Sequence, residues 1–257
     1  MVIKVAIAGP RGKMGKEAFG TIIKNEELLL VGMLDSKLEE TNLGDIPIYT
    51  SLVELIKETD PDVLVDLTVP SSVYEHTVTA LEYGVRPVIG TTGFTEEQLA
   101  TISCLVEDKK LGCIIAPNFS IGAVLMMKFA QTAAKYLPDI EIIEMHHDQK
   151  LDAPSGTAIK TAQMIQEVRE AVKQGSEKEE ELMDGVRGAD YDGMRIHSVR
   201  LPGLVAHQQV LLGGEGQLLT LRHDSFNRSS YMSGIVLSIQ EVMKRDKLIY
   251  GLEEIIL

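Results

Sequence analysis

The feature that most constrains the fold is the alternation of short apolar runs with helix-like stretches in the first half of the chain. The apolar runs cover residues 2–8, 28–34, 63–68, 85–89 and 111–116. A strand that is apolar at consecutive positions needs cover on both faces, as in a parallel sheet between two layers of helices. Helices are predicted between the runs at residues 13–25, 71–83 and 95–108. The alternation predicts an α/β domain with a doubly wound parallel sheet.

The pattern changes after Asn118 and predicts a second domain of the α+β class. Helices are predicted at 121–136 and 155–173, and strands at 140–147, 195–200, 206–212 and 217–223. The last three strands are separated by turn sequences, which favours a mixed or antiparallel sheet. Residues 174–193 are polar and rich in glutamate and glycine, so we expect an exposed loop. A final helix, 229–244, is expected to return to the first domain. The predicted boundaries are 1–118 with 229–257, and 119–228.

Charge narrows the possible partners. The 257 residues carry a formal net charge of −13, which argues against a nucleic-acid surface, since that needs a basic stripe. The first ten residues, MVIKVAIAGP, are interpreted as a buried strand and not as a secretory signal, and we expect no membrane span. The two cysteines suggest no disulfide framework, and we expect a cytoplasmic protein. An anionic substrate would require cationic groups and helix N-termini to be gathered at one place.

A glycine-rich turn follows the first predicted strand. In IAGPRGKMG, Gly9, Gly12 and Gly15 open the first helix with the spacing GxxGxxG. Such glycines allow a tight turn and a close approach of the backbone to a pyrophosphate at the helix N-terminus. Asp35 stands at the end of the second strand, where a carboxylate can accept hydrogen bonds from the adenosine ribose. The turn therefore predicts a Rossmann-type site for NAD(P)H, against the alternative of a glycine-rich turn without a ligand.

The sequence leaves the choice between NADH and NADPH open. Asp35 favours the free ribose hydroxyls of NADH, whereas Lys37, with Arg11 or Lys13, could hold a 2′-phosphate. Two later loops, residues 90–94 and 116–120, follow predicted strands where the nicotinamide half should lie. In the second loop, Phe119 could pack on the nicotinamide ring.

Residues 144–158 read EMHHDQKLDAPSGTA, with two adjacent histidines, then a lysine, then Pro-Ser-Gly-Thr. A zinc site would need three or four ligands, and adjacent histidines at a strand end point to opposite faces. We therefore predict no metal, although a metal site and a plain polar loop both stay open as alternatives. Pro154 ends the preceding segment, and Ser155-Gly156-Thr157 opens a helix whose free N–H groups suit an anion. With Lys150 as a point cation and histidines that titrate near neutral pH, the stretch predicts a site for a carboxylate substrate.

These motifs together resemble one enzyme family. GPRGKMG, GTTGF, APNFSIG and EMHHDQKLDAPSGTA, with FNRSSYMSG near the C-terminus, are similar to 4-hydroxy-tetrahydrodipicolinate reductases, also called dihydrodipicolinate reductases. The resemblance implies NAD(P)H-dependent reduction of 4-hydroxy-tetrahydrodipicolinate to tetrahydrodipicolinate in lysine and diaminopimelate biosynthesis. It also implies a cyclic dicarboxylate substrate and a homotetramer with subunit contacts through the sheets of the second domain.

The same resemblance assigns roles to residues. His146 would donate or accept a proton, Lys150 would donate one, and His147, Gly156 and Thr157 would bind substrate. The cofactor would be bound by Gly9, Pro10, Arg11, Gly12, Lys13, Met14, Asp35, Gly90, Thr91, Thr92, Ala116, Pro117, Asn118 and Phe119.

Small departures from the family pattern bear on the cofactor alone. Lys13 stands where arginine is common, and Ser36 stands where some members place an arginine for the 2′-phosphate. Two rivals are a different oxidoreductase on the same plan, such as an amino-acid dehydrogenase, and a nucleotide sensor without turnover. The rival oxidoreductase would not need the HHxxK sequence beside PSGT, and the sensor would bind the cofactor tightly and tolerate Lys150→Ala.

Overall fold

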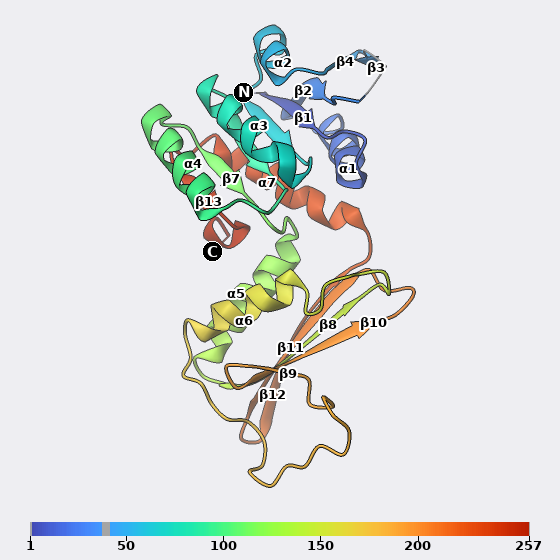
Figure 1. The fold of residues 1–257 in the computed structure, drawn as a ribbon, viewed down its shortest axis with the longest axis vertical. Helices are drawn as coiled ribbons and strands as arrows, with labels where there is room; N and C mark the ends of the chain where they lie inside the picture. Colours follow the sequence, from blue (N-terminus) through green and yellow to red (C-terminus); the bar gives the residue numbers. More distant parts are fainter. Residues whose placement is uncertain (1, 38–41, 257) are drawn as a thin grey trace. The chain divides into compact units, whose positions relative to one another are not determined.

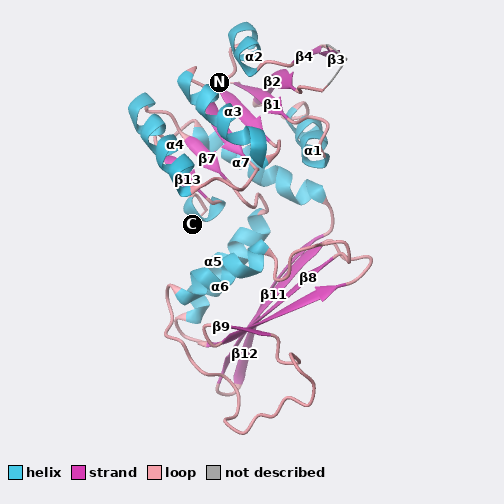
Figure 2. Ribbon diagram, viewed as in Figure 1, coloured by secondary structure: helices cyan, strands magenta, loops and turns pink. Residues whose placement is uncertain are grey.

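The computed structural model describes residues 2–37 and 42–256. It divides into two compact units, residues 1–121 with 228–257 (unit 1) and residues 122–227 (unit 2). Each unit has its own sheet and its own helices (Figures 1 and 2). Within the described residues, no helix combines the length and the apolar character that a bilayer crossing requires.

Unit 1 contains an eight-stranded sheet of the predicted doubly wound type. The strands are β1 (Ile3–Ala8), β2 (Leu28–Leu34), β3 (Asn42–Leu43), β4 (Ile46–Tyr49), β5 (Val63–Asp66), β6 (Arg86–Ile89), β7 (Cys113–Ile115) and β13 (Leu248–Tyr250). Their order is β13-β7-β6-β5-β1-β2-β4-β3. All neighbouring pairs are parallel except β3 with β4. The chain order reverses beside β1, which places the carboxyl ends of β1 and β5 at the switch point where ligands of such sheets bind.

Burial explains why the central strands are continuously apolar. Four consecutive residues of β1, Val5 to Ala8, are completely buried, and all four residues of β5 are buried as well. The helices of unit 1 are α1 (Lys13–Ile22), α2 (Leu52–Thr59), α3 (Pro70–Glu82), α4 (Glu96–Lys109) and α7 (Met232–Val242), with short 3-10 helices at Arg228–Tyr231 and Leu252–Glu254. Helix α7 packs against β6, β7 and α1.

The sequence missed the short elements of unit 1. Strands β3, β4 and β13 span only two to four residues each, and β4 contains a proline and is only half-buried, so periodicity gives little signal. Helix α2 has eight residues and depends on the Ser51 side chain, which accepts a hydrogen bond from Glu54 N.

Unit 2 contains a five-stranded mixed sheet and two helices, where the sequence predicted four strands in a mixed or antiparallel sheet and two helices. The strands are β8 (Asp139–His146), β9 (Ala189–Tyr191), β10 (Met194–Arg200), β11 (Ala206–Gly214) and β12 (Gln217–Ser225), and the helices are α5 (Ile121–Ala134) and α6 (Gly156–Gln166). The order is β12-β11-β8-β10-β9. Strand β8 lies at the centre, parallel to β10 and antiparallel to β11. The polar residues of β8 therefore lie between two strands whose side chains can form hydrogen bonds and ion pairs with them.

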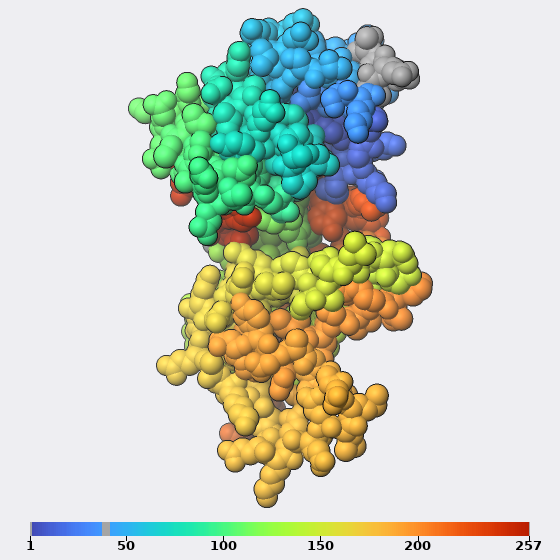
Figure 3. Space-filling view, viewed as in Figure 1, coloured from blue at the N-terminus to red at the C-terminus, as the bar shows by residue number. Residues whose placement is uncertain are grey.

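Two predictions for unit 2 were wrong in detail. Helix α6 was expected to reach residue 173 but ends at Gln166. The reason is tertiary, because the buried guanidinium of Arg169 donates to the backbone oxygens of Pro138 and Asp192, which directs the chain away from the helix. The predicted loop 174–193 contains β9 at its end. The rest of that segment lies on the surface, in yellow and orange in Figure 3.

Candidate active site

The glycine turn of unit 1 has the shape that the sequence predicted. Gly9 follows β1 with a φ of +83°, and a Cβ atom there would lie 2.9 Å from the Leu67 backbone oxygen. A Cβ atom on Gly15 would lie 2.1 Å from the Gly9 oxygen, so the turn closes only with glycine at this position. Helix α1 begins at Lys13 with Gly12 as its N-cap. A glycine cap has no side chain to occupy the first N–H groups, which suits an anionic ligand at this helix end.

Asp35 follows β2 directly and is buried beside the turn. Its carboxylate oxygens accept hydrogen bonds from Arg11 Nε at 2.5 Å and Nη2 at 2.8 Å, and Lys37 N donates to Oδ1 at 3.0 Å. The Arg11 hydrogen bond is the main reason that the pKa of Asp35 lies below its ordinary value. Asp35, which favours free ribose hydroxyls, therefore forms an ion pair with Arg11, a cation that could hold a 2′-phosphate.

The two later loops meet at the carboxyl ends of β6 and β7. Ala116 N donates to Ile89 O at 2.8 Å, and a Cβ atom on Gly90 would lie 2.8 Å from the Phe119 ring. Phe119 is only 3% exposed, so its ring is packed against the Gly90 backbone. Thr91 Oγ1 donates to Thr68 O at 3.0 Å, and Asn118 Oδ1 accepts from Ser120 N at 2.8 Å. Thr92 and Pro117 lie in the same two loops.

A buried acid between the glycine turn and the Gly90 loop was not singled out from the sequence. Asp66, the last residue of β5, is 1% exposed. It accepts from Thr68 N at 2.8 Å and from Thr68 Oγ1 at 2.5 Å, and it pairs with His76 Nδ1 at 2.7 Å. These bonds fix the segment whose Leu67 oxygen borders Gly9. Asp66 could have been found from the sequence as a carboxylate at the end of the strand beside β1, at the switch point of the sheet.

The turn, Asp35 and the two loops form one edge of unit 1 that fits a dinucleotide. The positions where a side chain would fill the turn are glycines, the α1 N-terminus faces the turn, and an acid follows the neighbouring strand. These are the features by which doubly wound sheets bind NAD(P).

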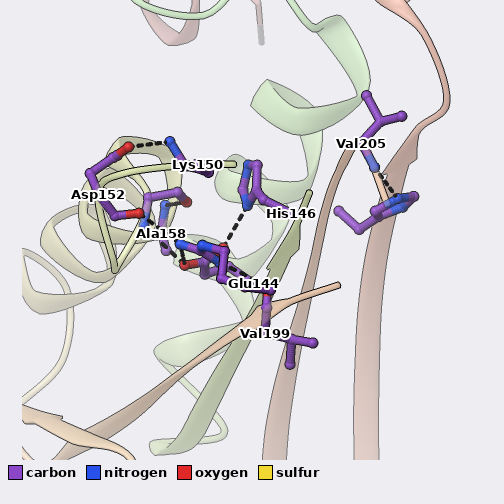
Figure 4. A network of polar contacts seen from close by, with 10 residues as sticks. Glu144, His146, Lys150, Asp152, Ala158, Val199 and Val205 are labelled. Atoms are coloured by element: carbon purple, nitrogen blue, oxygen red, sulfur yellow. Dashed lines mark hydrogen bonds and ion pairs between the residues drawn. The ribbon is translucent and has the colours of Figure 1, made fainter. Parts of the chain in front are cut away.

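In unit 2, the His146 side chain is held by a buried carboxylate. His146 is the last residue of β8, and its Nδ1 lies 2.6 Å from Oε2 of Glu144, a residue with no exposed surface (Figure 4). Glu144 and His146 are two residues apart on a strand and therefore share a face. His147 follows the strand and is exposed. Within the described part of the chain, no group of three or more His, Cys, Asp and Glu side chains is arranged to hold a metal ion.

Glu144 also binds Arg200 and the start of α6. Arg200 donates through Nη1 to Oε2 at 2.9 Å and through Nη2 to Oε1 at 2.7 Å, and Ser155 N donates to Oε1 at 3.2 Å. Burial opposes ionisation of the carboxyl group. Hydrogen bonds from His146, Arg200 and Ser198 outweigh burial and lower the pKa of Glu144 from 4.5 to about 2. Neither Glu144 nor Arg200 was a predicted site residue.

The lysine and the helix start complete the cluster. Lys150 Nζ lies 2.6 Å from Asp152 Oδ1, and the Asp152 backbone oxygen accepts from Arg200 Nη2 at 2.7 Å (Figure 4). Ser155 caps α6, since its Oγ accepts from Ala158 N at 3.2 Å. A Cβ atom on Gly156 would meet nothing within 4 Å, so there is room for a ligand at the first turn. Thr157 follows in that turn and is half-buried. All five predicted catalytic and substrate residues lie in one segment of unit 2, residues 146–157.

Comparisons with known proteins cover both units. The family models for dihydrodipicolinate reductase match residues 3–119 (N-terminus) and 122–256 (C-terminus). The 4-hydroxy-tetrahydrodipicolinate reductase of Lysinibacillus sphaericus is 63% identical with 100% of both chains covered, and that of Bacillus pumilus is 59% identical with 99% and 98% covered.

Solved structures agree with this result. The dipicolinate-bound dihydrodipicolinate reductase from Paenisporosarcina sp. TG-14 is 60% identical, covers 100% of both chains and superposes with a TM-score of 0.95. A probable dehydrogenase from Thermotoga maritima is 11% identical with a TM-score of 0.64, covering 93% of this chain and 89% of its own. This second likeness shows the fold alone.

Proposed function

We propose a division of roles for this chain, which belongs to the dihydrodipicolinate reductase family and is an NAD(P)H-dependent oxidoreductase. Residues 1–118 with 229–257 form the dinucleotide-binding domain, and residues 119–228 form the substrate-binding and oligomerisation domain. The substrate is 4-hydroxy-tetrahydrodipicolinate, a cyclic dicarboxylate, and the product is tetrahydrodipicolinate of lysine and diaminopimelate biosynthesis. The relatives named above carry the same activity in their names.

The observation that carries the proposal is the arrangement around the start of α6. Lys150, half-buried and paired with Asp152, lies in the loop that leads to the open first turn of α6 at Gly156. A substrate carboxylate is bound by the N–H groups of this turn and by the Thr157 hydroxyl, because a helix N-terminus favours negative charge. His147, exposed beside the strand end, contributes a further polar contact to the substrate.

Proton transfer is assigned to two side chains. When bound, NADH or NADPH supplies a hydride. Negative charge that develops on the substrate ring is quenched by a proton from Lys150, and His146 assists by donating or accepting a proton. Loss of water from the 4-hydroxy group precedes or accompanies reduction. The ring would thus gain one hydride and one proton and lose one water, and the bound cofactor would supply the two electrons of the reduction.

The cofactor contacts come from the edge of unit 1 described above. The turn from Gly9 to Met14 holds the pyrophosphate, Asp35 and Arg11 meet the adenosine ribose, and residues 90–92 and 116–119 bind the nicotinamide half. The close packing of glycines in the turn supports this assignment. We further propose a homotetramer with subunit contacts through the sheet of unit 2, and a cytoplasmic location, which the unpaired Cys104 and Cys113 support.

The activity is tested by following cofactor oxidation while the preceding synthase generates the substrate in situ. Lys150→Ala should lower kcat by about a hundredfold or more, since general acids contribute about 10²–10⁴, with cofactor affinity unchanged. The matched control is Lys135→Ala, an exposed lysine of the same unit, which should behave as wild type. Oxidation no faster than without enzyme would overturn the proposal. Equal loss of cofactor binding in Lys150→Ala would make the cluster structural.

A further inference from the structure

Glu144 has no role in the reaction as proposed, yet it contacts His146 and the residue that caps the start of α6. It is a carboxylate without exposed surface at the centre of the unit 2 sheet. An unpaired buried charge is costly, so such a group persists only where its partners are fixed. Its partners are His146, Arg200, Ser198 and the Ser155 amide.

The donors around Glu144 show that it is an ionised acceptor. A guanidinium and a backbone N–H can only donate, and together they use both carboxylate oxygens. The His146 Nδ1 at 2.6 Å must therefore carry the hydrogen of its bond to Glu144. That bond fixes the tautomer, because the neutral ring then has its lone pair on Nε2. Nε2 is therefore the ring nitrogen that can exchange a proton with a ligand.

Arg200 gives the carboxylate a second function. Its guanidinium neutralises Glu144 through a two-bond contact, which keeps a buried negative charge from repelling a dicarboxylate nearby. The same Nη2 donates to the Asp152 backbone oxygen, and the Asp152 side chain holds Lys150. A chain of contacts therefore joins Glu144 to the proposed proton donor. Through Ser155 N, the carboxylate also anchors the first turn of α6.

We infer that Glu144 is a positioning residue, which with Arg200 fixes the Nδ1–H tautomer of His146 and holds the Lys150 loop against the start of α6. The inference rests on the proposed function for its consequence in catalysis. The tautomer itself is a property of the free protein and can be measured without substrate.

The first test is ¹⁵N NMR of the full-length wild-type protein labelled at histidine, recorded at alkaline pH. The His146 signals are identified by their loss in His146→Asn. We expect a protonated Nδ1 and an unprotonated Nε2. A neutral ring protonated at Nε2 would overturn the inference, whatever the outcome of the activity assay. This measurement needs no variant at Glu144 and so does not depend on how that variant folds.

The second test compares Glu144→Gln with Glu144→Asp. Glutamine has no charge and can donate to Nδ1, so the Nε2–H tautomer should become populated. The kcat should fall about 10–100-fold, by analogy with the loss of a hydrogen-bond partner that orients a metal-ligating histidine. The KM for the cofactor should not change. Aspartate keeps the charge and should recover part of kcat and the Nδ1–H signal. A merely structural residue would leave the tautomer unchanged in Glu144→Gln, and that result would reject the inference. Absence of activity in the wild type would instead reject the proposed function.

Discussion

Replacing Glu144 by glutamine should remove a stabilisation of unit 2 that depends on pH in a calculable way. The pKa of this carboxyl group is lowered from 4.5 to about 2 in the folded protein, where hydrogen bonds from His146, Arg200 and Ser198 outweigh the opposing effect of burial. One pKa unit corresponds to about 1.36 kcal/mol, so the ionised form contributes about 3 kcal/mol. A group whose folded pKa is depressed stabilises fully above its unfolded pKa, and the contribution disappears as the pH falls through the folded pKa. The free energy of unfolding should therefore differ between wild type and Glu144→Gln by about 3 kcal/mol at pH 7, about 1 kcal/mol at pH 3, and less than about 0.5 kcal/mol at pH 2.

The assay must report on unit 2 alone, because the chain has two units. Samples equilibrated in urea at each pH are labelled by a short pulse of hydrogen exchange at a fixed pH. Mass spectrometry of peptides from β8 and β11 then gives the unfolding transition of the unit 2 sheet. Glu170→Gln, at an exposed position of the same unit, is the matched control and should follow wild type at every pH. A difference that stays near 3 kcal/mol down to pH 2 would refute the reasoning, because the lost stability would then come from packing and not from the ionised carboxylate. No difference at pH 7 would refute it equally.

Three further predictions concern unit 1. Arg11→Ala leaves the Asp35 carboxylate without its guanidinium partner. The KM for NADPH should then rise about tenfold relative to the KM for NADH, because an unpaired carboxylate repels a 2′-phosphate. An unchanged ratio of the two KM values in steady-state kinetics would exclude this role of Arg11. Gly15→Ala places a Cβ atom 2.1 Å from a backbone oxygen of the turn and should cost about 2 kcal/mol or more in urea denaturation, and wild-type stability would contradict the close packing. Burial raises the pKa of the Cys113 thiol, whereas Cys104 is exposed. A thiol reagent should therefore label one cysteine in the native protein and two after unfolding, and two fast native reactions would count against this burial.

The sequence predicted the main features of unit 1 because their signals are local. Continuous apolar runs mark strands covered on both faces, and GxxGxxG marks a turn in which side chains do not fit. Strands of two to four residues carry too few positions for a period to be recognised, and so β3, β4 and β13 were missed. The end of α6 was also misplaced, because the Arg169 contacts that divert the chain involve residues 31 and 23 positions away.

In the candidate site too, the sequence shows the residues that are neighbours in the chain and does not show contacts between distant ones. His146, Lys150 and the Ser155-Gly156-Thr157 turn could be found because they are adjacent in sequence and their chemistry is visible in one stretch. Glu144 lies in that stretch too, but on a strand it is only one polar residue among alternating positions. Its significance depends on Arg200, which is 56 residues away in sequence and is brought in by the parallel pairing of β10 with β8. Sequence spacing cannot show that contact, since it is created by the order of the strands in the sheet.

The pairing of charges explains how the proposed substrate site can accept a dicarboxylate in a chain with a net charge of −13. The one fully buried carboxylate of the cluster, Glu144, is neutralised by Arg200. The carboxylate paired with Lys150 belongs to Asp152, whose side chain is 60% exposed and therefore can move into solvent at small cost. A substrate carboxylate can thus replace Asp152 as the partner of Lys150. The lysine stays paired throughout this exchange, and the helix N-terminus at Gly156 adds an attraction that Asp152 does not use. Substrate binding then requires no net cationic surface, because the substrate only has to displace the exposed Asp152 carboxylate from Lys150.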